Sequence, residues 1–121
     1  MPKKIYIAGP MRGKQNLNYD AFKKAELDLV AAGYQAINPH HLGEQIQDEK
    51  LWTKEYLATV LLNDLYHLSI CDCGALLPGW GLSRGAIVEY SFAEYLKMPV
   101  MTVNNWLEAA KLEKEICQDG N

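Results

Sequence analysis

The amino-acid sequence predicts an α/β fold with a parallel sheet, and two observations support this. Short apolar segments of strand type alternate with longer segments whose apolar residues recur at helical spacing. The order of the predicted elements is β-α-β-α-β-α-β-α, which favours parallel strands joined by right-handed crossovers. With 121 residues, 49% of them hydrophobic, the chain fits one domain over residues 1–121.

The first half of the chain contains two predicted strands and one predicted helix. Residues 3–8 are apolar on both faces, as in a central parallel strand. Residues 16–32 carry apolar side chains at helical spacing, and Gly33 stands where a helix commonly ends. Residues 34–38 predict a short second strand, and the polar residues 40–50 predict a loop.

The second half repeats this alternation. Residues 51–68 predict a helix and residues 74–77 a short, fully apolar strand. Ser83 is a suitable N-cap for a helix that reaches about residue 96. Residues 99–103 predict the fourth strand, and Asn105 is expected to cap a last helix. We therefore expect a three-layer sandwich with a sheet of four to five strands, flavodoxin-like or Rossmann-like.

Composition excludes several classes of function. The net charge is −3 and no long basic run exists, so a nucleic-acid polymer is not an expected partner. No apolar run has the length of a membrane span, and no signal peptide is evident, which predicts a cytoplasmic protein. The three cysteines lack the spacing of a zinc site, so we expect reduced thiols and no metal. No cofactor is expected either.

Two glycine-containing loops follow the first and third predicted strands. Ligands of parallel α/β sheets bind at the carboxyl ends of strands, so both loops are candidates for binding. In GPMRG, Gly9 to Gly13, backbone N–H groups can approach an oxyanion and Arg12 adds a charged donor. The alternative is a tight turn with a solvent-facing arginine. In PGWGLSRG, Trp80 either stacks on a base or covers the core.

Two carboxylates stand in unusual surroundings. Glu89 lies six residues after Ser83, on a helix face with the small residues Gly85 and Ala86, which indicates close approach of a ligand. Asp64 lies in an otherwise apolar stretch near the end of the preceding helix. If both face one crevice, they form a pair that can divide the roles of nucleophile and acid. The alternative is that each is a solvated surface residue.

The three segments IYIAGPMRG, NDL and SRGAIVE together resemble the nucleoside 2-deoxyribosyltransferase superfamily and the related 2′-deoxynucleoside 5′-monophosphate N-glycosidases. The order and approximate spacing of the motifs hold from Ile5 to about Val103. The pattern LPGWxxSxGAxxE is most similar to that of short, largely uncharacterised phage and bacterial members. The resemblance implies a homodimer or a larger homo-oligomer.

The resemblance also implies roles for individual residues. Glu89 would attack C1′ of a deoxyribose, and Tyr6 would donate a hydrogen bond near this nucleophile. Asp64 would lie beside Glu89 and help to protonate the departing base or position the sugar. Residues 9–13, including Met11 and Arg12, match the loop near the sugar 5′ end, and Ser83 matches a serine that binds a 5′-phosphate. Proline at position 10 replaces a small hydroxyl residue of the N-glycosidases and removes one N–H donor.

We therefore expect an enzyme that cleaves, or transfers across, the N-glycosidic bond of a 2′-deoxynucleoside or its 5′-monophosphate, with a small-molecule nucleoside or nucleotide as its partner. Water as acceptor gives a hydrolase, and a second base gives a transferase. One alternative is a nucleotide-binding or sensing module that uses the same crevice without turnover. Others are an α/β domain that works through protein contacts and an enzyme that hydrolyses a ribosyl cofactor.

Overall fold

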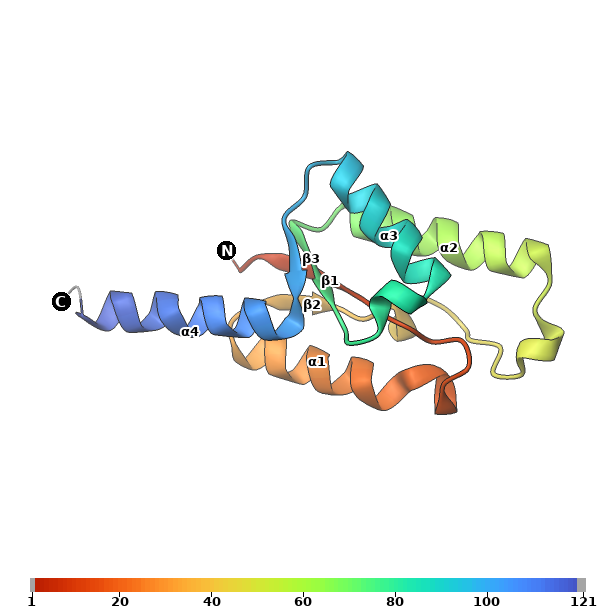
Figure 1. Ribbon diagram of the computed structural model, residues 1–121, viewed down its shortest axis with the longest axis horizontal. Helices are drawn as coiled ribbons and strands as arrows, with labels where there is room; N and C mark the ends of the chain where they lie inside the picture. Colours follow the sequence, from red (N-terminus) through yellow and green to blue (C-terminus); the bar gives the residue numbers. More distant parts are fainter. Residues whose placement is uncertain (1, 120–121) are drawn as a thin grey trace.

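A computed structural model describes residues 2–119 and places a four-stranded sheet between two layers of helices (Figure 1). The elements follow in the order β1 (Lys4–Ala8), α1 (Tyr19–Ala31), β2 (Gln35–Ile37), α2 (Lys54–Ser69), β3 (Cys73–Leu76), α3 (Arg84–Tyr95), β4 (Val100–Thr102) and α4 (Val103–Asp119). Short 3-10 turns precede three of the helices: η1 (Gln15–Asn18), η3 (Glu49–Leu51) and η4 (Trp80–Leu82).

The strand order is β2-β1-β3-β4, and all neighbouring strands are parallel. The predicted α/β fold with a parallel sheet of four strands is therefore confirmed. β1 and β3 are neighbours, with Tyr6 opposite Gly74 in the register. The chain reverses its direction of winding between β2 and β3, so the carboxyl ends of β1 and β3 form the switch point at which such sheets bind ligands.

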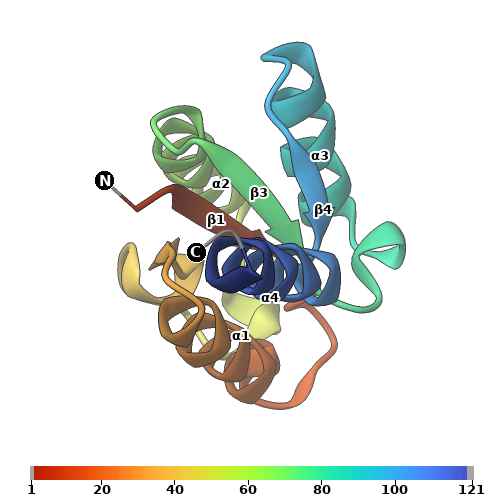
Figure 2. The ribbon, with the colours of Figure 1, turned by 90° about the vertical axis from the view of Figure 1, so that its left-hand side faces the viewer.

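Alternation along β1 divides the core into two halves. Ile5 and Ile7 point toward α1 and α4, where they pack with Phe22 and Trp106. Tyr6 and Ala8 point to the opposite face and pack with residues of α2, β3 and α3. Figure 2 shows the two helix pairs on opposite sides of the sheet. Because side chains of a strand alternate between faces, Tyr6 is directed at α3 while its neighbours build the other core.

α1 begins at Tyr19 and not at residue 16, because residues 16–18 have positive φ. Two further helix starts differ from the prediction. α2 begins at Lys54 and not at residue 51, because the Thr53 hydroxyl accepts a hydrogen bond from the Tyr56 N–H at 3.0 Å and forms the N-cap. α4 begins at Val103, so the predicted capping role of Asn105 is wrong. Its own N–H donates to the Thr102 hydroxyl at 3.1 Å. In both cases a threonine hydroxyl satisfies an N–H of the first turn.

Within the described residues 2–119, no helix is both long enough and apolar enough to cross a bilayer.

Candidate active site

The centre of the candidate site is a hydrogen bond between β1 and α3. The Tyr6 hydroxyl donates to Oε2 of Glu89, and both side chains are buried, at 0% and 7% exposure. The two residues are 83 positions apart in the chain. A glutamate on a helix that packs against a sheet would ordinarily face water. The burial of Glu89 between α3 and the sheet is therefore the main feature to explain.

Burial determines the protonation of this pair. It raises the pKa of Glu89 from 4.5 to about 8, the hydrogen bond from Tyr6 opposes that rise, and the charge of Asp64 adds to it. Burial also raises the pKa of Tyr6 well above its usual value, with the Glu89 charge as the second cause. At neutral pH the phenol therefore stays a donor, while the carboxyl exchanges its proton within the physiological range.

Asp64 supplies the second carboxylate from α2. Burial raises the pKa of Asp64 from 3.8 to about 7, and the neighbouring His67 partly offsets this. The negative charge of Asp64 also raises the pKa of both Tyr6 and Glu89, so the three groups are close enough for their charges to interact. Two carboxyls with elevated pKa values at one place are typical of sites that hold one proton between two groups.

The start of α3 determines where Glu89 lies. Ser83 is the N-cap, as predicted, and its hydroxyl accepts a hydrogen bond from the Ala86 N–H at 3.3 Å. Glu89 follows two turns into the helix, with Ala86 and Ala93 buried on the same side. Gly85 lies one turn before Glu89, and a Cβ built on it would meet no other atom within 4 Å. The approach to this face of α3 is therefore open at Gly85.

The loops after β1 and β3 lie against each other, as the sequence predicts for neighbouring strands. A Cβ on Gly9 would lie 2.7 Å from the Leu77 side chain, so only glycine fits there. A Cβ on Gly79, whose φ is +84°, would lie 3.5 Å from the Pro10 ring. The position of Pro10 is fixed as well, because its carbonyl accepts a hydrogen bond from the Asn18 side-chain amide at 2.9 Å.

Two residues of the first loop contact a segment that the sequence did not connect with them. The Gly13 N–H donates to Oε2 of Glu49 at 2.8 Å. The Arg12 guanidinium lies 5.1 Å from the ring centre of Trp52, within cation–π range. Arg12 is therefore not simply solvent-facing, and Glu49 and Trp52 are site neighbours that sequence spacing missed. Glu49 lies in the predicted loop 40–50, and Trp52 lies in the segment 51–68 that was predicted as a helix.

Trp80 and Met11, the remaining predicted residues, pack on opposite sides of the sheet. Trp80 is half-buried, and its ring is 4.8 Å from that of Tyr90, the residue after Glu89. It packs against the core on the α2 and α3 side of the sheet. Met11 packs against the other core, with α1 and α4, so the structure does not bring its side chain to Glu89.

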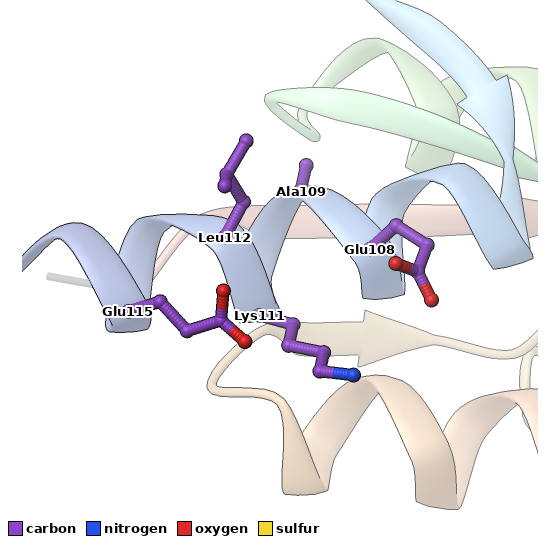
Figure 3. A pocket seen from close by; sticks show the side chains of 5 residues that line it. All are labelled: Glu108, Ala109, Lys111, Leu112 and Glu115. Carbon is purple, nitrogen blue, oxygen red and sulfur yellow. The ribbon is translucent and has the colours of Figure 1, made fainter.

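The cavity beside Glu89 is much smaller in volume than the hollow along α4. Tyr6, Glu89 and Tyr90 border a cavity of only about 10 Å³, which is about the space of one water molecule. A hollow of about 310 Å³ lies instead along α4 and includes Leu112 and Lys111 (Figure 3). α4 itself lies on the opposite side of the sheet from α3 (Figure 2). The hollow contains none of the predicted site residues.

Comparison with protein families identifies residues 3–102 as a match to the family described as Domain of unknown function (DUF4406). The chain belongs to this family. The matched region runs from β1 through β4 and includes Tyr6, Asp64 and Glu89. Among curated proteins, none matches the chain.

Five chains of solved structures also match. One is the 2-deoxyribosyltransferase from the psychrotolerant bacterium Bacillus psychrosaccharolyticus, characterised as a biocatalyst for the synthesis of antiviral and antitumoral nucleosides. It is 26% identical in sequence, with a TM-score of 0.60, and the match covers 82% of this chain and 70% of that chain. This DUF4406 protein therefore resembles a nucleoside-processing enzyme over most of its length, which agrees with the superfamily resemblance of its motifs.

Proposed function

We propose that the protein cleaves or exchanges the N-glycosidic bond of a 2′-deoxynucleoside or its 5′-monophosphate, with Glu89 as nucleophile. The observation that carries the proposal is the buried hydrogen bond from Tyr6 to Glu89, with Asp64 close enough to raise the pKa of that glutamate. Similarity to a 2-deoxyribosyltransferase supports the same chemistry.

The proposed reaction begins when the ionised Glu89 carboxylate attacks C1′. The C1′–N bond breaks through an oxocarbenium-like state, and its electron pair stays on the base nitrogen. The base takes up the one proton that Glu89 and Asp64 hold between them near neutral pH, in the state in which Asp64 carries it and Glu89 is ionised. Water or the N–H of a second base then attacks C1′ of the glycosyl ester and gives its proton to the Asp64 carboxylate, while the C1′–O bond breaks and Glu89 leaves as a carboxylate. The Tyr6 hydroxyl holds the attacking carboxylate in place throughout.

The substrate would enter from the carboxyl ends of β1 and β3. Gly85 leaves open space one turn before Glu89, which supports approach of the sugar along this face of α3. Arg12 and residues 9–13 are proposed to lie at the sugar 5′ end, and Ser83 to contact a 5′-phosphate where one is present. Trp80 is proposed to contact the base.

Base release tests the proposal. Each natural deoxynucleoside and 5′-monophosphate is incubated with the protein, with and without a free acceptor base, and the products are separated by chromatography. We expect release by the wild type and none by Glu89→Gln or Glu89→Ala. Glu94→Gln is the matched control, because Glu94 is exposed on the same helix. Full base release by both Glu89 variants would contradict the proposal.

The second candidate function is binding of the same ligands without turnover. The volume beside Glu89 is only about 10 Å³, so a ligand bound at the outer loops with its sugar away from the carboxylate would not react, which favours this alternative. A melting temperature raised by nucleosides or nucleotides, with no product on chromatography, would support it over catalysis.

We also propose that the protein forms a homodimer or a larger homo-oligomer. In support, α2 exposes the large apolar residues Leu62 and Tyr66, at 68% and 62% exposure, and its C-cap residue Ile70 is 50% exposed. Light scattering of the wild type and of Leu62→Asp measures this directly. A monomeric wild type at micromolar concentration would refute it. The cytoplasmic location stays a prediction.

A further inference from the structure

Two donors of the loop after β1 are already occupied by the chain itself. Glu49 accepts the Gly13 N–H at 2.8 Å, a charge-assisted hydrogen bond of ideal length. Arg12 lies over the Trp52 ring, 5.1 Å from its centre. Pro10 has no N–H, so position 10 offers no donor to an anion.

The segment that carries Glu49 is held by its own hydrogen bonds. The Trp52 indole N–H donates to the Ile46 carbonyl at 2.7 Å, and the Ile46 N–H donates to the Tyr56 hydroxyl at 3.0 Å. Asp48 caps η3, with its carboxylate accepting the Lys50 N–H at 3.0 Å. Glu49 therefore lies in a turn that hydrogen bonds hold against the start of α2, and its contact with Gly13 does not depend on an unconstrained loop.

We propose that Glu49 is a specificity-determining residue that disfavours a 5′-phosphate and favours a 5′-hydroxyl. The inference rests on the proposed function, in which residues 9–13 lie at the sugar 5′ end. A carboxylate on the Gly13 amide takes the N–H that a phosphate needs and sets a like charge beside it. An uncharged 5′-hydroxyl meets no such repulsion and can itself donate to a carboxylate.

A phosphate can bind at this loop only after it displaces Glu49. Displacement of Glu49 would free the Gly13 N–H. Arg12 would then leave the Trp52 ring and bind the phosphate oxygens, whose geometry a guanidinium matches well. Removing the Glu49 charge should therefore strengthen binding of phosphate-bearing ligands selectively. The ratio of monophosphate affinity to nucleoside affinity is the quantity that Glu49 controls.

The test uses isothermal titration with Glu49→Gln and Glu49→Ala, each made in the Glu89→Gln protein so that no ligand is consumed. The probes are inorganic phosphate, the deoxynucleosides and their 5′-monophosphates. We expect phosphate and monophosphate affinities to rise on the order of tenfold in both variants, with nucleoside affinity changing far less. Glu44→Gln removes the same charge from an exposed position of the same segment and should leave all affinities unchanged.

A constant affinity ratio in both Glu49 variants, or weaker monophosphate binding, would overturn the inference. So would undetectable binding of phosphate and monophosphate by Glu49→Gln, which keeps the hydrogen-bond acceptor and so preserves the fold. Failure of the proposed function looks different. In that case the wild type releases no base from any substrate, whereas the phosphate titrations still report on Glu49.

Discussion

Replacing Glu89 with glutamine should stabilise the protein at neutral pH. Burial raises the pKa of Glu89 from 4.5 to about 8, so the folded protein holds a proton that the unfolded chain has released across this range. Stability then falls as pH rises from 4.5 through 8, because the folded state binds more protons than the unfolded state. Glutamine is neutral at every pH and can still accept the Tyr6 hydrogen bond.

The magnitude follows from the pKa difference. Each pH unit above 4.5 lowers the free energy of unfolding of the wild type by about 1.4 kcal/mol relative to Glu89→Gln, up to the folded pKa. At pH 7 the variant should therefore be more stable by about 3 kcal/mol, or roughly 10 °C in melting temperature. Asp64 is present in both proteins, so the difference isolates Glu89.

Urea unfolding of both proteins at pH 6, 7 and 8 measures this gain, with Glu94→Gln as the exposed control. The control should differ from wild type by at most about 0.5 kcal/mol. Parallel stability curves for wild type and Glu89→Gln across this range would refute the reasoning, because they would mean that the Glu89 carboxyl is well solvated. The predicted gain also means that the protein retains a destabilising carboxyl at this position, as functional sites commonly do.

Three further outcomes are expected. The rate of base release should peak between about pH 7 and pH 8, where Glu89 and Asp64 together hold one proton. Tyr6→Phe should move the acidic limb of this profile to higher pH, because it removes the hydrogen bond that lowers the pKa of Glu89. A rate that stays constant from pH 5 to 9 would contradict the paired roles. Gly9→Ala should lower the free energy of unfolding by about 1–3 kcal/mol, since its Cβ meets Leu77 at 2.7 Å, whereas Gly81→Ala, with no atom within 4 Å, should be neutral by denaturant unfolding. Ser83→Ala should cost about 1 kcal/mol through loss of the α3 cap, while Ser91→Ala in the middle of the same helix should not, and equal effects would exclude the cap as the cause.

The sequence predicted the strands and their order along the chain because each apolar run is bounded by glycine or proline, whereas the order β2-β1-β3-β4 within the sheet is a finding of the structure. It also indicated that Glu89 is unusual, since small residues beside it predicted close approach of a ligand, but its burial at 7% exposure is a finding of the structure. That α3 begins after Ser83 was likewise predictable, because an N-cap is a local interaction of one hydroxyl with the N–H three residues later.

The contacts of the first loop could not be predicted in the same way. Gly13 and Glu49 are 36 positions apart, and no periodicity links them. The start of α2 was misplaced because Leu51 and Trp52 continue the apolar pattern of the helix, although Thr53 caps it. Trp52 instead turns back to the Ile46 carbonyl and to Arg12, which only the tertiary structure reveals.

The most direct measurement of the proposed mechanism is detection of the glycosyl ester itself. The protein is incubated with a deoxynucleoside that carries fluorine at C2′, which slows both steps by destabilising the oxocarbenium-like state, and is then digested for peptide mass spectrometry. A nucleophilic Glu89 predicts a sugar adduct on the peptide of α3 that contains residue 89, and none in Glu89→Gln. Steady base release with an adduct on another residue, or with no adduct at all, would contradict it.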